Sequence, residues 1–415
     1  MRRKATEIEE IAAAYLFATE DLTQAEIGKT LGISAPVVSR LLASARRNNY
    51  LIEEFRFGEE RLQPGTMQAV RQRLSPNALA DKLHALSMRT CQRPGPRVRV
   101  FPTPGQPAGE EEALAAFARQ ATPHIRDLVL RSRYCGVTWG RMLQNVIRAM
   151  RNLRMPARSP RLDVIPLAGE PLGMEPTPSS SSTLAHELGR IINGDKYHAR
   201  SLTMVPALVP SDFTRAERLA VFKLVERLPD YGAIFGRVAA HQKLKTEAYR
   251  LDCILTSLFP RALGFTGGQA LSDAEMELFV GDMGGVMFPR PDLSKADERL
   301  TQDIEARWTG LRQDHVEACA ERARAFADDR KGPPGVILIS VGEKRAHVVL
   351  EAIKRGLINH LVIDSQLEQA LTRSPDLRSL PPAVNVGQRQ RTVSRRALRP
   401  AKGLPVARPA NGASW

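Results

Sequence analysis

A short stretch near the N-terminus constrains the fold more than any other part of the sequence. Thr23 and Glu26 have the spacing of a capping box, which predicts that a helix begins directly after Thr23. Gly32 suits the left-handed residue that ends such a helix, and Ser34 suits the N-cap of a second helix. The stretch therefore predicts two short helices joined by a tight turn.

The apolar residues of this stretch have the positions of a helix-turn-helix. Gly28 is small where the two helices approach each other, and Ile33 fills the turn. Val38 and Leu41 then pack the second helix back against the first. The second helix has no acidic residue, and residues 34–47 carry a net charge of +3. Such a helix enters the major groove of DNA, whereas the alternative is an αα-hairpin without a role in DNA binding.

A DNA-contacting surface follows from this arrangement. We expect contacts from the first residues of both helices and from the exposed side of the second helix. The expected residues are Thr23, Gln24, Ser34, Ala35, Pro36, Ser39, Arg40 and Arg46.

One more helix is expected ahead of this pair, from Thr6 to Thr19. Apolar residues recur along it at helical spacing, which is the pattern of an amphipathic helix. The stripe consists of Ile8, Ile11, Ala12, Tyr15 and Leu16.

The net charge of +15 indicates a polyanionic partner, but the excess lies outside the helix-turn-helix. Residues 1–57 are neutral overall, whereas residues 61–100 and residues 375–415 each carry a net charge of +7. We expect the last segment to be a disordered tail that folding does not require and that attracts DNA of any sequence.

Length and helix-breaking residues predict four parts. A chain of 415 residues suits two domains, and prolines interrupt it between residues 64 and 107. A second breaker-rich stretch, Pro171–Ser182, is expected to be a surface loop. The four parts are a helix-turn-helix domain (1–57), a Pro-containing basic linker (58–109) with a short helix around Asn77–Leu86, an effector domain (110–374) and a basic disordered tail (375–415).

The sequence lacks the marks of a membrane protein or a metalloprotein. No apolar run approaches the ~18 residues of a spanning helix, and the N-terminus has no apolar signal-peptide region. The four cysteines form no CxxC pair, which argues against zinc and against disulfides. We therefore expect a cytoplasmic protein with no cofactor, no metal and no membrane partner.

The larger domain is expected to have an α/β fold with a mainly parallel sheet, because short apolar runs alternate with amphipathic helical stretches. Ligands of such sheets bind beyond the carboxyl ends of the strands, so three strand ends draw attention. The candidate strands are Leu128–Leu130, Tyr134–Val137, Leu162–Pro166, Ser201–Val205, Tyr231–Phe235, Val336–Ile339 and Leu361–Ile363.

The first strand end carries Gly136, Thr138 and Gly140 before a helix that begins near Arg141. Glycines let backbone amides approach an anion, and a helix N-terminus favours negative charge. The alternative is a tight turn that needs glycine for its geometry alone. We expect these four residues to surround an anion together with Lys344.

Lys344 and Asp364 follow the other two strand ends. Lys344 lies in the first turn of a helix, which is unfavourable for a cation unless it faces an anion. Asp364 either caps the next helix or orders the site. The alternatives are a solvated lysine and a plain helix cap.

Six segments resemble one family. Residues Leu22–Leu42 resemble the helix-turn-helix of the SorC/DeoR-type sugar-binding transcriptional regulators. The other five resemble the sugar-binding domain of that family, in the same order along the chain. They are Gly136–Met142, Val164–Gly169, Leu202–Pro210, Phe279–Gly284 and Gly342–Asp364.

The resemblance implies an N-terminal all-α domain followed by an α/β domain with the fold of phosphosugar isomerases. It implies a sugar or sugar-phosphate effector, and it adds Asp282 of the Gly-Asp segment to the effector-binding residues. It also implies a double-stranded DNA operator, assembly as a homodimer or homotetramer, and RNA polymerase as a further candidate partner.

Three positions depart from the family pattern. Val341 stands where a glycine precedes the Glu-Lys pair, and Met142 stands where a hydroxyl residue is frequent. Phe288–Pro291 intervenes before Asp292, where an acidic residue normally follows directly. All three lie near the expected sugar or phosphate contacts, which indicates an unusual effector or a loss of sensing.

Two other functions remain open. One is a phosphosugar isomerase or deaminase with an appended DNA-binding domain, in which Asp282 or Asp364 would be the base. No two acid–base groups stand at a fixed short spacing, so we expect no catalytic residues and no enzyme. The other is a DNA-binding oligomer without a ligand.

Overall fold

The structure, a computed structural model, forms two compact units, residues 1–70 and residues 71–415. It describes residues 7–20, 22–48, 50–51, 77–102, 109–155, 161–170, 177–236, 246–260, 271–326 and 332–380. Parts of the predicted segments lie outside the described residues, among them 52–57 of the helix-turn-helix domain, 58–76 and 103–108 of the linker, 171–176 of the loop, and 381–415 of the tail.

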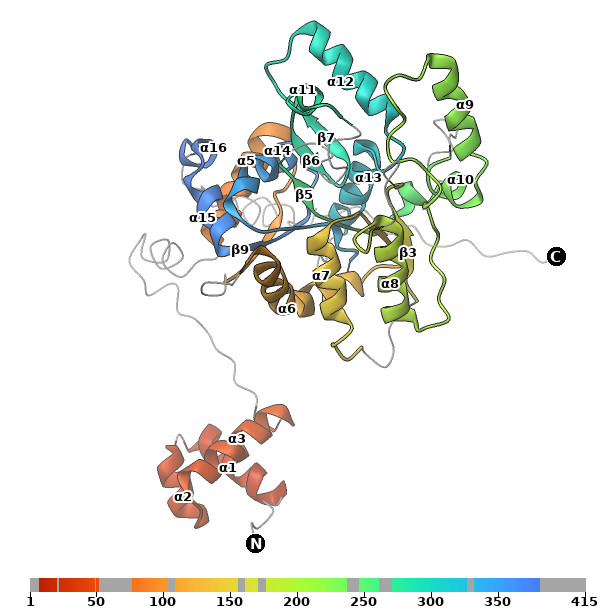
Figure 1. The fold of residues 1–415 in the computed structure, drawn as a ribbon. Helices are drawn as coiled ribbons and strands as arrows, with labels where there is room; N and C mark the ends of the chain where they lie inside the picture. Colours follow the sequence, from red (N-terminus) through yellow and green to blue (C-terminus); the bar gives the residue numbers. More distant parts are fainter. Residues whose placement is uncertain are drawn as a thin grey trace, which may run out of the picture. The chain divides into compact units, whose positions relative to one another are not determined.

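The N-terminal unit consists of α1 (Glu7–Thr19), α2 (Gln24–Leu31) and α3 (Ala35–Arg47) (Figure 1). The predicted capping box is confirmed, because Thr23 N donates to Glu26 Oε2 at 2.8 Å and Glu26 N donates back to Thr23 Oγ1. Gly32 ends α2 with φ 66°, the left-handed conformation that was predicted for it.

The turn between α2 and α3 depends on a close approach at Gly28. A Cβ atom added at Gly28 would lie 2.7 Å from the Ile33 carbonyl oxygen, so the position cannot hold a larger residue without a shift. Val38 and Leu41 are buried as predicted, together with Ile27 of α2. Because these side chains fix α3 on α2, the exposed face of α3 is held rigidly.

The helix predicted for residues 6–19 is confirmed as α1, but its apolar stripe is only partly buried, with Leu16 packed against the core of this unit. Ile8, Ile11 and Tyr15 are 79%, 44% and 59% exposed, and the helix instead buries Ala13 and Ala14. Small side chains let α1 lie close to its neighbours. Two polar contacts fix this rotation of the helix, from Tyr50 Oη to Glu7 Oε1 (2.5 Å) and from Asn48 Nδ2 to Glu10 Oε1 (2.7 Å).

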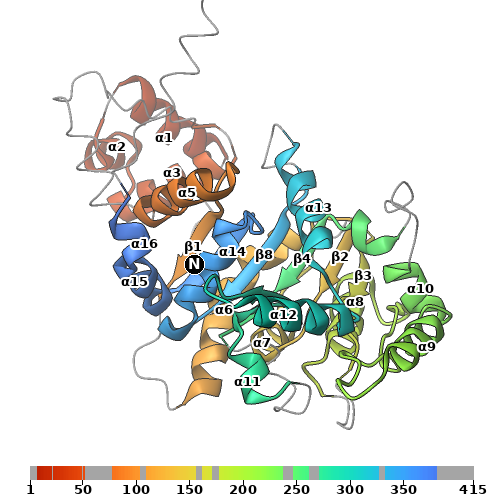
Figure 2. The ribbon, with the colours of Figure 1, turned by 90° about the horizontal axis from the view of Figure 1, so that it is seen from above.

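The second unit is built on a six-stranded parallel sheet in the order β1-β9-β8-β4-β2-β3 (Figure 2). All carboxyl ends therefore meet at one edge of the sheet and all amino ends at the other. The strands are β1 (Arg97–Phe101), β2 (Tyr134–Val137), β3 (Asp163–Pro166), β4 (Cys253–Thr256), β8 (Gly335–Ser340) and β9 (His360–Asp364).

Helices cover both faces of the sheet, so the strands are apolar on both sides. On β4, for example, Cys253 and Leu255 pack on one face and Ile254 on the other. The first face is covered by α6 (Glu110–Val129), α7 (Arg141–Met150) and α8 (Ser181–Asn193). Helices against the other face include α5 (Asn77–Cys91), α10 (Pro229–Phe235), α13 (Gln313–Arg324), α14 (Ala346–Lys354) and α15 (Ser365–Arg373).

A smaller antiparallel sheet and short helices complete this unit. The sheet has the order β5-β6-β7, and it begins two residues after β4 ends. Its strands are β5 (Leu258–Phe259), β6 (Phe279–Met283) and β7 (Val286–Pro289). The remaining helical segments are α9 (Arg215–Val225), α11 (Asp273–Met276), α12 (Lys295–Arg307), α16 (Pro375–Arg378) and the 3₁₀ turns η3 (Glu247–Arg250) and η5 (Glu343–Arg345).

Four of the seven predicted strands are confirmed, as β2, β3, β8 and β9. Three are wrong. Leu128–Leu130 is the end of α6, and Tyr231–Phe235 lies in α10, which begins at Pro229. Ser201–Val205 is a turn, although the next residue, Pro206, forms an isolated bridge with Glu170. In the first two cases an apolar run that resembled a strand is part of a helix, whereas in the third only Leu202 and Val205 are buried and Met204 is 82% exposed.

Both ends of the second unit extend beyond the predicted limits. The expected linker contains β1, which pairs with β9, and α5, which begins at the predicted Asn77 but runs on to Cys91. The expected tail contributes α16, whose Leu377 is fully buried. Ser181 and Ser182 of the expected loop already belong to α8.

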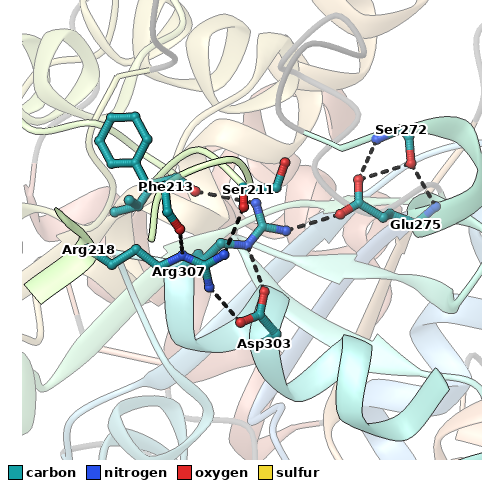
Figure 3. Close-up of polar contacts among 8 residues, drawn as sticks. Ser211, Phe213, Arg218, Ser272, Glu275, Asp303 and Arg307 are labelled. Atoms are coloured by element: carbon teal, nitrogen blue, oxygen red, sulfur yellow. Dashed lines mark hydrogen bonds and ion pairs between the residues drawn. The ribbon is translucent and has the colours of Figure 1, made fainter. Parts of the chain in front are cut away.

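A buried arginine, Arg307, forms ion pairs with two acidic residues next to the smaller sheet (Figure 3). Arg307, at the end of α12, lies 3.1 Å from Glu275 Oε1 and 3.4 Å from Asp303 Oδ2. Arg218 of α9 contacts the same Asp303 at 2.5 Å. One carboxylate therefore joins α9 and the end of α12.

Candidate functional site

The exposed face of α3 carries most of the expected DNA-contacting residues. Ala35, Pro36, Ser39, Arg40 and Arg46 lie on α3, Ser34 precedes it, and Thr23 and Gln24 lie at the start of α2. All eight are exposed except Ala35, which is half-buried. Ser34 has N-cap backbone geometry but makes no side-chain capping bond, so it is a cap only in its backbone. A helix start without a side-chain cap leaves backbone amides for a phosphate oxygen.

The arginines of α3 differ in how they are held. Arg40 Nε donates to the Pro36 carbonyl at 3.3 Å, one turn earlier, which orients the guanidinium along the start of α3. The Arg46 guanidinium lies 5.8 Å from the centre of the Phe17 ring of α1. Arg40 is therefore the better placed of the two to reach a base edge.

Thr23 acts mainly within its own helix. Its hydroxyl donates to Glu26 Oε2 at 2.7 Å, and this bond, with that from the Thr23 backbone, lowers the pKa of the Glu26 carboxyl. The capping box thus stays closed at neutral pH and fixes where α2 begins.

In the second unit, two adjoining cavities lie at the carboxyl edge of the large sheet, with volumes of about 50 and 280 Å³. Glu110, Leu114, Val341 and Arg345 line both of them. Position at the carboxyl ends of parallel strands agrees with the general rule for ligands of α/β sheets.

Arg345 supplies positive charge to both cavities. It ends the 3₁₀ turn η5, and its Nη1 donates to the Val341 carbonyl at 2.6 Å. Burial lowers the pKa of Arg345, and the charge of Arg141 lowers it further, whereas Glu110 and Asp364 raise it. A guanidinium nevertheless stays protonated in proteins, so the cavities keep a cation that is partly removed from water.

Lys344 lines neither cavity and is exposed. The expectation that Lys344 meets the first strand end at an anion is therefore not what the structure shows. The 3₁₀ turn places adjacent side chains about 120° apart, so Lys344 and Arg345 point in different directions.

Gly140 and Arg141 of the first strand end line the smaller cavity. Gly140 has φ 122°, and α7 begins after it without a side-chain cap. Arg141 forms ion pairs with Glu110 (3.1 Å) and Glu111 (3.9 Å), and all three side chains are more than half exposed. These pairs are therefore weak, and an anion could displace them.

Gly136 and Thr138 line neither cavity. A Cβ atom at Gly136 would come within 2.5 Å of the Leu167 side chain, so this glycine serves packing. Thr138 is fully buried, and its hydroxyl lies 3.1 Å from that of Thr256 on β4. For these two residues the alternative interpretation, local geometry, describes the structure.

The two aspartates hold backbone groups. Asp282 is fully buried in β6, and its Oδ1 accepts from Gly285 N at 2.9 Å in the β6–β7 turn. Asp364 lines the larger cavity and caps α15, because its Oδ1 accepts from Leu367 N at 3.1 Å. The same oxygen accepts from Gly342 N at 3.0 Å, so Asp364 also orders the turn before Arg345.

Ser340 is a site residue that the sequence analysis missed. It ends β8, lines the smaller cavity and is 2% exposed. Within the described part of the chain, its hydroxyl oxygen has no hydrogen-bond partner. Its position directly after the predicted strand Val336–Ile339 was the signal that could have identified it.

The described residues contain no cluster of His, Cys, Asp or Glu side chains that could hold a metal ion. Among the same residues, no helix has both the length and the apolar character needed to cross a membrane.

Comparison with known proteins gives matches among solved structures. No family model and no curated protein matches the sequence. The full-length sorbitol operon regulator SorC from Klebsiella pneumoniae is 17% identical and has a TM-score of 0.45, covering 87% of this chain and 98% of its own.

Two further solved structures are similar to this chain. A probable sor operon regulator from Shigella flexneri is 16% identical, with a TM-score of 0.46 and coverage of 70% of this chain and 98% of its own. A domain of a possible sugar-binding transcriptional regulator from Arthrobacter aurescens TC1 is 18% identical, with a TM-score of 0.45 and coverage of 72% and 99%.

Proposed function

We propose that the chain is a DNA-binding transcription regulator of a sugar-utilisation operon that responds to a sugar or sugar-phosphate effector. The geometry of α2 and α3 is the observation that supports DNA binding. A glycine-spaced turn fixes an acid-free helix, and that helix exposes Arg40 and Ser39 on its outer face. A helix held in this way fits the major groove of DNA.

The effector is proposed to bind in the two cavities at the carboxyl edge. Arg345, the uncapped start of α7 and the unpartnered Ser340 hydroxyl offer donors to an anion and to sugar hydroxyls. The solved structures that are similar in fold are described as sugar-operon regulators, which supports the same assignment.

We further propose a homodimer or homotetramer in the cytoplasm, with RNA polymerase as the partner through which transcription changes. A two-fold symmetric operator would then present two half-sites to two copies of α3.

Selection of duplexes from a random pool with the full-length protein tests this function. We expect enrichment of a motif with two related half-sites, and a change in affinity for that motif when one of a panel of sugar phosphates is added. If no motif is enriched in the selected pool, the result would contradict sequence-specific DNA recognition. Turnover of a sugar phosphate would instead support the isomerase-like alternative.

Arg40→Ala is expected to weaken binding to the selected duplex by about 1–3 kcal/mol if the side chain reads a base. Fluorescence anisotropy with selected and random duplexes measures this difference. Lys29→Ala is the matched control, because Lys29 is an exposed cation of the same unit near the end of α2. Equal affinity of wild type and Arg40→Ala for both duplexes would remove Arg40 from the interface.

A further inference from the structure

A third cavity, of about 150 Å³, lies at the opposite edge of the large sheet, where the strands begin. Its polar lining includes Arg97 of β1, Arg324 of α13 and His360 of β9. None of these residues belongs to the effector cavities. The volume is below the range of about 300–1,000 Å³ that is typical for drug-sized ligands, so a small ligand fits it better.

The pairing of two strands sets the geometry of this cavity. Arg97 is opposite His360 in the parallel ladder of β1 and β9. Residues paired in this way project from the same face of a sheet, so the guanidinium and the imidazole lie side by side. Arg324 approaches the same cavity from the end of α13.

His360 is the unusual member of this group. It is only 7% exposed, and among the described residues nothing forms a hydrogen bond with its ring. Burial lowers the pKa of His360 to about 3, with additional lowering by Arg97, Arg131 and His124. The ring is therefore neutral at pH 7, with one N–H donor that no described group accepts.

Arg324 retains donors after its internal contacts. Its Nη2 donates to the Gly356 carbonyl at 2.6 Å, and its Nη1 lies 3.0 Å from Glu321 Oε1. A guanidinium has five N–H groups, so these two bonds leave others for a ligand. Arg97 is exposed at the rim and is positioned at the mouth of the cavity.

We propose that the cavity between Arg97, Arg324 and His360 binds a small phosphate group, either inorganic phosphate or the terminal phosphate of a small metabolite. Arg97 would contact two of its oxygens in the bidentate manner of arginine–phosphate pairs, and the imidazole N–H would donate to a third. The phosphate would thus be held by donors from two neighbouring strands. This site is separate from the effector cavities, so it does not depend on the proposed function.

The test is a titration of the full-length chain, labelled at the histidine Cε1 carbons, with inorganic phosphate in a chloride buffer. NMR follows the His360 signal, which His360→Gln identifies among the eight histidines. We expect a saturable shift of that signal. Arg97→Gln should raise the midpoint about tenfold, and Arg97→Lys should raise it less because lysine lacks the fork of donors.

Arg99→Gln is the matched control, since Arg99 is an exposed arginine of the same strand that does not line the cavity. It should leave the midpoint within twofold of the wild-type value. Absence of a saturable shift would overturn the proposal, as would equal midpoints for wild type and Arg97→Gln. A shift caused by duplex DNA and not by phosphate would also overturn it, because the arginines would then contact the DNA backbone.

Discussion

Replacing Arg307 with methionine is expected to lower the free energy of unfolding of the second unit by about 3 kcal/mol. Arg307 is 1% exposed, and it neutralises Glu275 and Asp303 while its Nη1 donates to the Val209 carbonyl at 3.3 Å (Figure 3). Methionine retains much of the volume but leaves Glu275 without its arginine partner, whereas Asp303 keeps Arg218.

The size of this effect follows from the burial of the two acids. Removal of one member of a buried ion pair typically costs about 3–5 kcal/mol. Here the Glu275 and Asp303 side chains are 18% and 44% exposed, so water can stabilise them in part. The lower end of the range is therefore expected.

Urea denaturation followed by tryptophan fluorescence measures the change, because Trp139 and Trp308 are both buried in this unit. Arg290→Met is the matched control. Arg290 pairs with Asp292 at 3.3 Å, but both side chains are largely exposed, so a change of less than about 1 kcal/mol is expected. Similar losses in the two variants would show that the buried cluster contributes no more than a surface pair.

The N-terminal unit could be predicted from the sequence because local residues determine it. The capping box of Thr23 and Glu26, the left-handed Gly32 and the small Gly28 each act within a few residues of the chain. The rotation of α1 depended instead on contacts with Asn48 and Tyr50, some forty residues away. That distance is why the sequence pattern alone did not show which residues of α1 are buried.

In the second unit, strands flanked by clear signals were predicted and strands with ambiguous surroundings were not. β4 is four consecutive buried residues, which periodicity cannot distinguish from a helix segment. β1 alternates arginine with valine as an edge strand does, but the prolines around it indicated a linker. Pro229 is typical of the first turn of a helix and does begin α10, but the apolar run that follows it resembles a strand.

Some of the residues predicted to bind an effector line the two cavities at the carboxyl ends of the strands, and others do not. Gly140, Arg141 and Asp364 do line the cavities, because the rule about carboxyl ends holds for any parallel sheet. The choice between Lys344 and Arg345 depended on the 3₁₀ turn, whose orientation no sequence pattern specified. Ser340 could be identified as a site residue only from its burial, which depends on the packing of the sheet.

Arg345→Ala is expected to weaken binding of a phosphorylated sugar at least about tenfold, since a charged hydrogen bond contributes about 1.5–3 kcal/mol. Lys344→Ala should change the affinity less than about twofold, because the screened charge of an exposed lysine outside the cavity contributes little. The two variants remove the same charge from adjacent positions, so net charge cannot explain a difference between them. This expectation rests on the proposed effector function.

Calorimetry with a panel of sugar phosphates and the corresponding free sugars measures the effect. Only the phosphorylated ligands should lose affinity, because Arg345 would contact the phosphate and Ser340 the sugar or phosphate oxygens. Arg345 also donates to the Val341 carbonyl, so Arg345→Lys is included to separate loss of charge from loss of this tether. If Arg345→Ala and Lys344→Ala weaken binding equally, the cation that the effector meets is not Arg345. The anion would then have to bind outside the two cavities at the carboxyl edge.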